Sequence, residues 1–464
     1  MDVNTPKSDT APVGPLAGPG GIGGDASTSP MAADGHSGDS GRKKRARVHV
    51  LSATIDLETH IANYKDRGAR IDRLMFIADR CPPLQADASA LAITEIKQTS
   101  NAEKYLQAVT RLNEALYAQR KPMQPVDEKW VEETRQAVRA KTERLESELK
   151  SYRANSIKES IRMGYTDLGD HLFDAGDLSG ALKHYTRTKD YCATQKHILD
   201  MCMRVIRTGI SIGNFAHAHT FLVKAESIPD PPEREKLSSK IASIMGIINM
   251  ESGAYRKAAK NFLSIQFAHA DVIFETLSPN DIAVYGAITA LASFERSELK
   301  SQVFENSDFK QFLELEPQIR EMLYNFHALK FQACLEIMAR IKNDLLLDIY
   351  LHEHLDTLFQ LIRKKAIVQY FYPFMSVDMN KMAENLYCTV SELEHEVAAL
   401  IREGQIQARI DSHNKILRVK RTNQRSQLYA KSLEMAADYA FQRRLTVLRG
   451  KLLERELVVS MARR

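Results

Sequence analysis

Residues 165–185 read YTDLGDHLFDAGDLSGALKHY, and residues 242–262 repeat their spacing of small and large side chains as ASIMGIINMESGAYRKAAKNF. Both copies carry two glycines, an alanine and an aromatic residue at equal offsets: Gly169, Gly176, Ala181 and Tyr185, then Gly246, Gly253, Ala258 and Phe262. Small residues at fixed offsets let two antiparallel helices approach closely, and the aromatic residue four places after each alanine fills the space between them. The pattern predicts stacked helix pairs, an architecture typical of proteins that hold partners.

A weaker copy lies between these two. Gly213, Ala218 and Leu222 keep the offsets, but Ile206 stands where the first glycine would be. The proline-rich stretch at residues 228–232 then interrupts the periodicity before the third copy. We therefore expect three helix pairs, with packing in the middle pair that departs from the pattern.

The composition indicates a folded protein without a general affinity for nucleic acid. The chain has 464 residues, of which 44% are hydrophobic, enough for a large core distributed over roughly two to four units. Its 64 Lys and Arg against 59 Asp and Glu leave a net charge of +5. A basic cluster at residues 42–47 carries this whole excess, so the remainder is neutral and has no global attraction for phosphates.

Cysteine usage and hydropathy indicate the compartment. The five cysteines are odd in number and include no C-x-x-C pair, which favours a reducing compartment over a disulfide framework. No apolar run approaches the roughly 18 to 20 residues of a membrane span, and the first residues lack the pattern of a secretory signal. We expect a protein of the nucleus and cytoplasm, without a membrane partner.

The first 47 residues differ from the rest. Residues 1–41 are rich in Gly, Pro, Ser, Ala and Asp and nearly free of large apolar side chains, so burial cannot offset the entropy of ordering them and we expect disorder. The cluster that follows is either a nuclear-import signal or a solvated boundary, and it consists of Arg42, Lys43, Lys44, Arg45 and Arg47. Residues 18–23 match G-x-G-x-x-G but lack the flanking strand and helix that a nucleotide site needs.

The remaining chain divides into four segments by the spacing of its apolar residues. Helical spacing predicts two or three helices over residues 57–118, one long helix over 130–153, and further helix pairs from 280 to about 363. We expect N-terminal helices at 48–153, helical repeats at 154–275, a domain at 276–421 with a helical part (276–375) and a smaller module (376–421), and a C-terminal helix and tail at 422–464.

The smaller module begins with two predicted helices. Residues 378–387 read as a short helix and residues 391–403 as a second one. Ser391 and Glu394 match a capping box at the start of the second helix, and Gly404 marks its end.

A hairpin follows these helices. Residues 405–411 alternate as a strand, and after a turn residues 416–419 return as its partner. Helix, turn, helix and hairpin together predict a winged helix. Its hairpin exposes a strand edge, which is suited to pairing with another chain.

An apolar stripe marks a C-terminal amphipathic helix, because apolar residues recur at steps of four, three and four from residue 441 onward. A single helix cannot bury such a stripe alone. It packs either on the winged helix or, as we prefer, on helices of other chains. We assign the packing face to Leu433, Phe441, Leu445, Leu448 and Leu452.

No pattern of catalytic, cofactor-binding or metal-ligating residues stands out. Two histidine pairs, His217 with His219 and His352 with His354, are spaced by two residues, which on a helix directs the rings about 200° apart. The acid and imidazole side chains at residues 394–396 also point apart on a helix. We expect no catalytic residue, no cofactor and no metal.

The winged helix requires a choice between nucleic acid and protein as partner, since this shape often enters a DNA groove by its second helix. Here that helix carries one basic residue, Arg402, against Glu392, Glu394, Glu396 and Glu403. Such a helix lacks the attraction to phosphates that dominates DNA affinity. Basic residues at 418–425 leave a peripheral nucleic-acid contact open, but protein contact is favoured.

This order of elements resembles the PCI family, which the proteasome lid, the COP nine signalosome and a translation initiation factor share. Several blocks are similar to a signalosome subunit of that family: LGDH (168–171), GDL (176–178), FLELEP (312–317), NDLLLD (343–348) and DSHNKIL (411–417). The similarity extends from about residue 50 to about residue 457. It implies a mainly α fold: a TPR-like right-handed helical-repeat solenoid, followed by a winged-helix (PCI) module and a long C-terminal helix.

The resemblance also implies a function. Such subunits are non-catalytic parts of the complex that deneddylates cullins and so regulates cullin-RING ubiquitin ligases, while a different subunit holds the metalloprotease. Implied partners are signalosome subunits of PCI and MPN type and cullin-RING ligase components, with no small-molecule substrate. The C-terminal helix would enter a bundle of subunit tails. The winged-helix edge would join PCI neighbours through Gln405, Ile406, Gln407, Arg409, Ile416 and Leu417. The alternative is a PCI subunit of the proteasome lid, or of a translation initiation factor with nucleic-acid contact through the winged helix.

Overall fold

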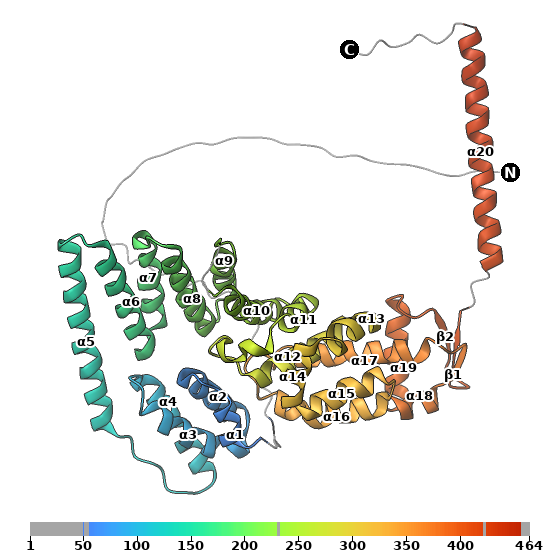
Figure 1. The fold of residues 1–464 in the computed structure, drawn as a ribbon. Coiled ribbons are helices and arrows are strands. Elements are labelled where there is room, and N and C mark those ends of the chain that lie inside the picture. Colours follow the sequence, from blue (N-terminus) through green and yellow to red (C-terminus); the bar gives the residue numbers. More distant parts are fainter. Residues whose placement is uncertain (1–49, 51–54, 230–232, 421–423, 456–464) are drawn as a thin grey trace, which may run out of the picture. The chain divides into compact units, whose positions relative to one another are not determined.

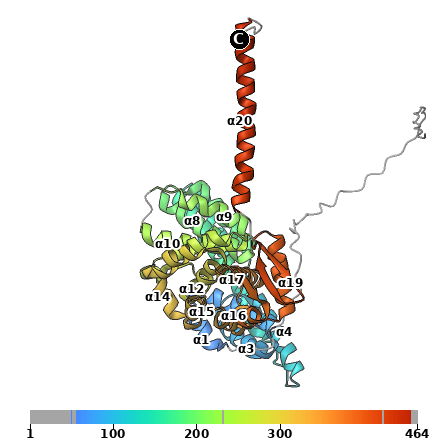
Figure 2. The same ribbon diagram turned by 90° about the vertical axis from the view of Figure 1, so that its right-hand side faces the viewer.

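The computed structural model describes residue 50 and residues 55–229, 233–420 and 424–455. The chain divides into residues 1–47 and residues 48–464, and all described residues belong to the second unit. The expected disordered tail, the basic cluster at 42–47 and the G-x-G-x-x-G match therefore lie outside the described residues. Figures 1 and 2 show the helices and strands in two views.

The described part begins with four α-helices, where the sequence predicted two or three. They are α1 (Leu57–Ala62), α2 (Arg67–Arg80), α3 (Gln85–Ile96) and α4 (Ala102–Ala118), with a 3₁₀ turn η1 (Pro82–Leu84) after α2. Asp56 and Asn101 cap α1 and α4, because their side chains accept backbone N–H groups of the first turn. Pro82 and Pro83 begin the 3₁₀ turn, where a missing N–H is tolerated.

One long helix, α5 (Glu128–Ala154), leads into the repeats, which confirms the single helix predicted over 130–153. It buries only three side chains, Val131, Leu145 and Leu149. Val131 belongs to the main hydrophobic core. The two leucines instead form a separate cluster with Ile161, Tyr165 and Leu168. The first part of the helix therefore contacts the main core, and its second half contacts the smaller cluster.

Three helix pairs follow, as the repeats predicted. They are α6 (Lys158–Ala175) with α7 (Leu178–Arg187), α8 (Gln195–Ile212) with α9 (Phe215–Glu226), and α10 (Arg234–Glu251) with α11 (Tyr255–Leu263); short 3₁₀ segments are η2 (Thr188–Tyr191) and η3 (Phe267–Val272). Gly176, Gly213 and Gly253 stand between the two helices of each pair with φ of 94°, 83° and 76°. Glycine adopts this left-handed backbone without strain, so these three residues set the turns.

The first repeat glycine sets how closely the paired helices approach. A Cβ atom on Gly169 would lie 2.5 Å from Cε1 of Tyr185, and one on Gly246 would lie 2.4 Å from Cε1 of Phe262. Each aromatic residue comes sixteen positions after its glycine, and its ring occupies the space where a side chain would begin.

In the middle pair a larger side chain replaces the glycine and a smaller one replaces the aromatic residue. Ile206 stands at the glycine position and Leu222 at the aromatic position, and both side chains are fully buried. The close approach moves to Gly209, where an added Cβ would lie 3.4 Å from the Cβ of Ala218. The expected departure in this pair is therefore a displacement of the tight contact by nearly one helical turn.

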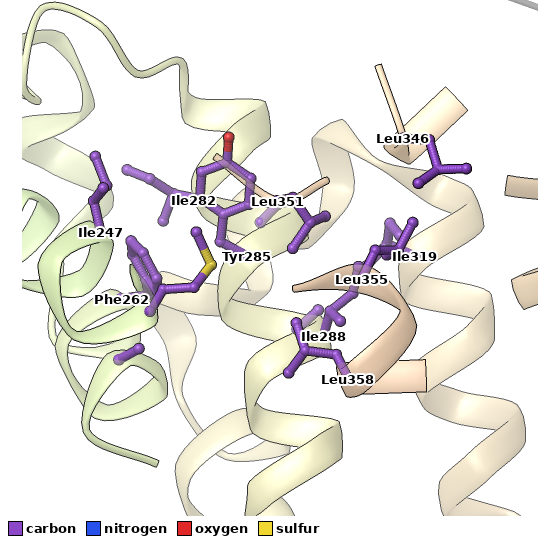
Figure 3. Close-up of a cluster of buried hydrophobic side chains, with 14 of the residues drawn as sticks. Ile247, Phe262, Ile282, Tyr285, Ile288, Ile319, Leu346, Leu351, Leu355 and Leu358 are labelled. Carbon is purple, nitrogen blue, oxygen red and sulfur yellow. The ribbon is translucent and has the colours of Figure 1, made fainter. Parts of the chain in front are cut away.

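The repeats continue into further helices without a break in the core. These are α12 (Pro279–Ser293), α13 (Arg296–Glu298), the π-helical segment η4 (Leu299–Phe304), α14 (Ser307–Leu315), α15 (Pro317–His327), α16 (Phe331–Leu345) and α17 (Leu355–Phe371). Figure 3 shows Phe262 of α11 near Tyr285 of α12, with Leu355 and Leu358 of α17 in the same cluster. The hydrophobic core thus extends across residue 276, where the sequence suggested a boundary.

A small sheet with two helices forms the predicted winged helix. Its elements are β1 (Ser376–Asp378), α18 (Met379–Asn385), α19 (Val390–Arg402), β2 (Ala408–Asp411) and β3 (Ile416–Val419). Strand β3 lies between β1 and β2 and pairs antiparallel with both. Figure 2 shows α19 beside the strands. The sequence did not predict β1.

Two local predictions in the winged helix were wrong. The capping box of α19 is formed by Thr389 and Glu392 instead of Ser391 and Glu394, because the helix begins at Val390. Strand β2 begins at Ala408 instead of residue 405, because the N–H of residue 405 still bonds the Leu400 carbonyl at the end of α19.

The last described element is α20 (Gln424–Glu454), a helix of 31 residues. Every side chain from residue 425 to residue 455 is exposed. Among the described helices, α20 included, none is both long and apolar enough for a membrane span.

Candidate interaction surfaces

The winged-helix sheet has two outer strands, β1 and β2, since β3 is paired on both sides. The predicted interface residues divide into exposed Gln405, Gln407 and Arg409, half-buried Ile416, and buried Ile406 and Leu417. Ile406 and Leu417 are 4% and 0% exposed and belong to the core, so they hold the hairpin in place from inside. In the described part of the chain β1 and β2 each pair with β3 alone, so each has one edge without a strand partner. The predicted interface uses the open edge of β2, and its contact with a PCI neighbour stays a prediction.

Arg409 and Arg418 are directly opposite each other on β2 and β3. Both side chains are exposed, and neither forms an ion pair with a carboxylate in the described part of the chain. Like charges opposite each other destabilise a strand pair. The arginine pair therefore weakens the isolated hairpin while it concentrates positive charge beside the open edge.

The acidic residues of α19 are largely neutralised by neighbouring elements. The carboxylates of Glu394, Glu396 and Glu403 pair with Lys415, Arg363 and Lys364 at 2.9, 2.8 and 2.8 Å. The repulsion of phosphates inferred from the sequence of this helix alone is therefore weaker than expected. These pairs also leave no positive excess on α19, so DNA groove binding gains no support.

Helix α20 exposes two apolar stripes on successive halves. The predicted packing residues are 36–62% exposed: Leu433, Phe441, Leu445, Leu448 and Leu452. A second group in the first half is 59–71% exposed: Leu428, Met435 and Tyr439. At about 3.6 residues per turn this group lies about 130° around the axis from the stripe after residue 440. The helix can thus meet neighbours on two sides.

A buried ionic network joins the N-terminal helices to the helices before the winged helix. Arg73 of α2 is 2% exposed, and its two terminal nitrogens donate to Asp281 of α12 and to Asp348, each at 2.8 Å. The hydroxyls of Tyr64 and Tyr285 donate to these carboxylates at 2.8 and 2.7 Å. A buried charge that lacks such partners is strongly destabilising, so each member needs the others.

The network shifts several pKa values. Burial raises the pKa of Asp281 to about 6, although Arg73 opposes this. Burial acts in the same direction on Asp348, but the charge of Arg73 and hydrogen bonds outweigh it and hold the pKa of Asp348 below its ordinary value. Burial and the charge of Arg73 lower the pKa of His60 to about 4. Arg73 and Asp281 are buried, and Arg73 is bonded to both Asp281 and Asp348, so these three residues support the fold.

The histidine pair His352 and His354 makes structural contacts. His354 lies between α10 and α11, with Nδ1 3.2 Å from the Tyr255 hydroxyl and Nε2 3.3 Å from a Glu251 carboxylate oxygen. His352 Nδ1 lies 2.8 Å from the carbonyl oxygen of Ile349. Within the residues that the structure describes, no group of three or more His, Cys, Asp or Glu side chains could hold a metal ion.

Family models match two parts of the chain. The model described as 26S proteasome subunit RPN7 covers residues 127–302, and the PCI domain model covers residues 331–421. The first match runs from the start of α5 into η4, and the second from α16 through the winged helix.

Two signalosome subunits match nearly the whole chain, and a proteasome subunit matches part of it. COP9 signalosome complex subunit 1 of Arabidopsis thaliana is 42% identical over 90% of this chain and 94% of its own length. Subunit 1b of the same complex from Drosophila melanogaster is 37% identical over 91% of this chain and 89% of its own length. The 26S proteasome non-ATPase regulatory subunit 6 of Caenorhabditis elegans is 22% identical over 62% of this chain and 72% of its own length. The chain therefore belongs to the COP9 signalosome complex subunit 1 family of PCI-domain proteins.

Proposed function

We propose that this protein is a non-catalytic scaffold and regulatory subunit of a signalosome, the complex that deneddylates cullins and thereby regulates cullin-RING ubiquitin ligases. It acts through protein–protein contacts, and a partner subunit supplies the metalloprotease activity. Its partners are other signalosome subunits of PCI and MPN type and components of the ligases. It needs no cofactor and no small-molecule substrate.

The match to COP9 signalosome complex subunit 1 carries this proposal. At 42% identity it covers 90% of this chain and 94% of the plant protein. The exposed apolar stripes of α20 and the open edge of β2 support contacts with other subunits, because an apolar helix face and an unpaired strand are typical docking elements.

Co-purification tests the proposal. A tagged full chain expressed in cells of its own organism is recovered with its partners, which are identified by mass spectrometry. We expect signalosome subunits with the full chain and fewer of them when residues 424–464 are removed. A chain without residues 1–41 serves as the control for truncation. Recovery of proteasome-lid or initiation-factor subunits in their place would refute the assignment.

The location of the protein is a separate proposal. We propose that it occupies nucleus and cytoplasm and that the basic cluster Arg42–Arg47 contributes to import. A fluorescent fusion with this cluster changed to alanine should then shift towards the cytoplasm, and an unchanged distribution would exclude the cluster as an import signal.

A second candidate is a subunit of the proteasome lid. The match of the proteasome RPN7 model to residues 127–302 favours it, but the proteasome relative is only 22% identical. The helical repeats suit both complexes. The same co-purification separates them, since the two complexes have different subunits.

Nucleic-acid contact is a third candidate, supported by the unneutralised pair of Arg409 and Arg418. It predicts affinity for RNA or DNA that falls steeply as salt rises, because phosphate contacts release counterions. Absence of binding at low salt would eliminate it.

A further inference from the structure

A shallow, open pocket of about 490 Å³ lies between the second helices of the first two helix pairs. Its lining comes from three elements: Leu182, Lys183, Thr186 and Arg187 of α7, Lys189 and Asp190 of η2, and His217 of α9. It is separate from the winged helix and from α20. None of the candidate surfaces described above includes it.

The sequence of α7 explains why this face is free. Ala181 and Tyr185 are buried, and these two positions pack α7 against its neighbours. Residues 182 and 186 form one row along the same helix and residues 183 and 187 form the next row, because positions four apart share a side. Both rows lie away from the row of Ala181 and Tyr185. The 3₁₀ segment η2 continues the chain directly after α7 and adds Lys189 and Asp190 to the wall.

The pocket carries positive charge that the described residues do not neutralise. Three cationic side chains and one carboxylate line it, and Lys183, Arg187 and Lys189 form no ion pair within the described ranges. Two arginines on the first helices of the same pairs behave differently: Arg162 of α6 pairs with Glu159, and Arg207 of α8 pairs with Asp66. Concentrated charge of one sign in a concave site attracts ions of the opposite sign.

His217 adds a hydrogen-bond donor. Its Nδ1 is buried without a hydrogen-bond partner in the described structure, and its ring lies 4.9 Å from that of Phe221. A buried Nδ1 without an acceptor favours the tautomer that carries the proton on Nε2. The Nε2–H group can then donate to a ligand oxygen.

We propose that this pocket binds an anionic group presented by a peptide segment of a partner protein, either a phosphorylated side chain or clustered Asp and Glu. The volume exceeds that of a single phosphate, so residues on either side of the anionic group fit, and Leu182 offers them an apolar wall. Nucleic acid fits less well, because no Phe, Tyr or Trp lines the pocket for base stacking. The proposal does not depend on signalosome membership.

Fluorescence anisotropy on the full chain tests the proposal. The probes are a labelled peptide with two phosphoserines, the same peptide with glutamates, the unphosphorylated serine peptide, and a single-stranded oligonucleotide of equal charge. Inorganic phosphate serves as competitor. We expect both acidic peptides to bind, the serine peptide to bind more weakly, and affinity to fall as salt rises. A preference between the two acidic peptides identifies the source of the anionic group.

Charge variants locate the binding. Lys183→Gln and Arg187→Gln should each weaken the acidic peptides by about two- to fivefold, and Asp190→Asn should tighten them by a similar factor. The matched control is Lys260→Gln, because Lys260 on α11 occupies the repeat position of Lys183 outside the pocket. All four side chains are exposed, so the melting temperature should not change.

Three outcomes would overturn the proposal. These are an equal loss of affinity with Lys260→Gln and Arg187→Gln, no binding of either acidic peptide at low salt, and pocket-dependent binding of the oligonucleotide in place of the peptides. The last result would assign the pocket to nucleic acid.

Discussion

At Gly246 the third helix pair has no space for one methyl group, because Phe262 occupies it. We predict that Gly246→Ala lowers the free energy of unfolding by about 1–3 kcal/mol, the usual range for overpacking a core. Adding Phe262→Leu should restore part of the loss, since the middle pair already combines a larger residue with Leu222. Urea denaturation followed by circular dichroism measures both variants.

The control for this prediction is Gly450→Ala on α20, where an added Cβ meets nothing within 4 Å. It should leave the unfolding of the helix pairs unchanged. The prediction fails if Gly246→Ala, like this control, leaves the free energy of unfolding unchanged. It also fails if Phe262→Leu restores none of the lost stability.

His60 and Asp281 should act on stability in opposite directions over the same pH range. The folded pKa of His60 is lowered to about 4, so the folded state binds fewer protons and stability is lost as the pH falls from about 6.5 to 4. The folded pKa of Asp281 is raised to about 6, so the folded state binds more protons and stability is gained as the pH falls from about 6 to 4. In the parent chain the two effects oppose each other.

Single substitutions should separate these effects. Relative to the parent chain, His60→Gln should become more stable as the pH is lowered from 7 to 5, because the variant lacks the histidine whose lowered pKa destabilises the fold at low pH. Asp281→Asn should become less stable relative to the parent chain over this range, because the variant lacks the carboxyl group whose raised pKa stabilises the fold at low pH. Melting temperatures at several pH values measure both differences. Equal slopes for the two variants would contradict the assigned pKa directions.

At the scale of elements, α20 should be dispensable for folding and needed for assembly. We predict that Phe441→Ser with Leu448→Ser leaves the melting temperature of the isolated chain unchanged, because both side chains are more than half exposed. The same change should reduce co-purification of partner subunits, since an apolar helix face drives association when it is buried. Thr446→Ala, which lies away from this stripe, is the matched control, and an equal effect of both changes would argue against the stripe as a contact.

The hairpin offers a second prediction at this scale. Arg409→Thr should raise the free energy of unfolding of the winged helix by a few tenths of a kcal/mol, because it removes a repulsion across β2 and β3. Arg418→Thr should have a similar effect, and the double variant should gain less than the sum, since either change already relieves the repulsion. A loss of stability in both single variants would mean that the arginines have favourable contacts.

Elements with strong local signals were predictable from the sequence. The helix pairs, α5 and the two winged-helix helices α18 and α19 have periodic apolar residues, and several of them have glycine or capping signals. Strand β1 was missed, because three residues cannot show an alternating pattern and its pairing with β3 is non-local. The capping box was misplaced, since Thr389 with Glu392 and Ser391 with Glu394 both match the same motif.

The candidate surfaces were less predictable than the fold. The exposed stripe of α20 follows from its own spacing, whereas the burial of Ile406 and Leu417 depends on how the hairpin sits on α19. Arg73 is one of four arginines in α2, so the local sequence does not mark it as the buried one. Its two carboxylate partners lie 208 and 275 residues further along the chain, and no local pattern identifies them.

At the scale of the whole molecule, Arg73 connects segments that are distant in sequence. We predict that Arg73→Met destabilises the chain by about 3–5 kcal/mol, because it leaves two buried carboxylates without a cation. Unfolding followed by fluorescence of Trp130, near the N-terminal helices, should then separate from unfolding followed by circular dichroism. Adding Asp281→Asn and Asp348→Asn should restore part of the stability. Coincident transitions in Arg73→Met would show that other contacts suffice to couple the segments.

The contact between α2 and α12 through Arg73 and Asp281 has a mechanical consequence. In an open stack of helix pairs each pair touches only its neighbours, so small rotations add up along the stack and the array is elastic. Here the contacts of Arg73 with Asp281 and Asp348 join the chain before the stack to the chain after it. Because these ion pairs link the two ends of the stack, the stack resists stretching. A force applied at the winged helix is then transmitted to the N-terminal helices directly, without extension of the repeats between them.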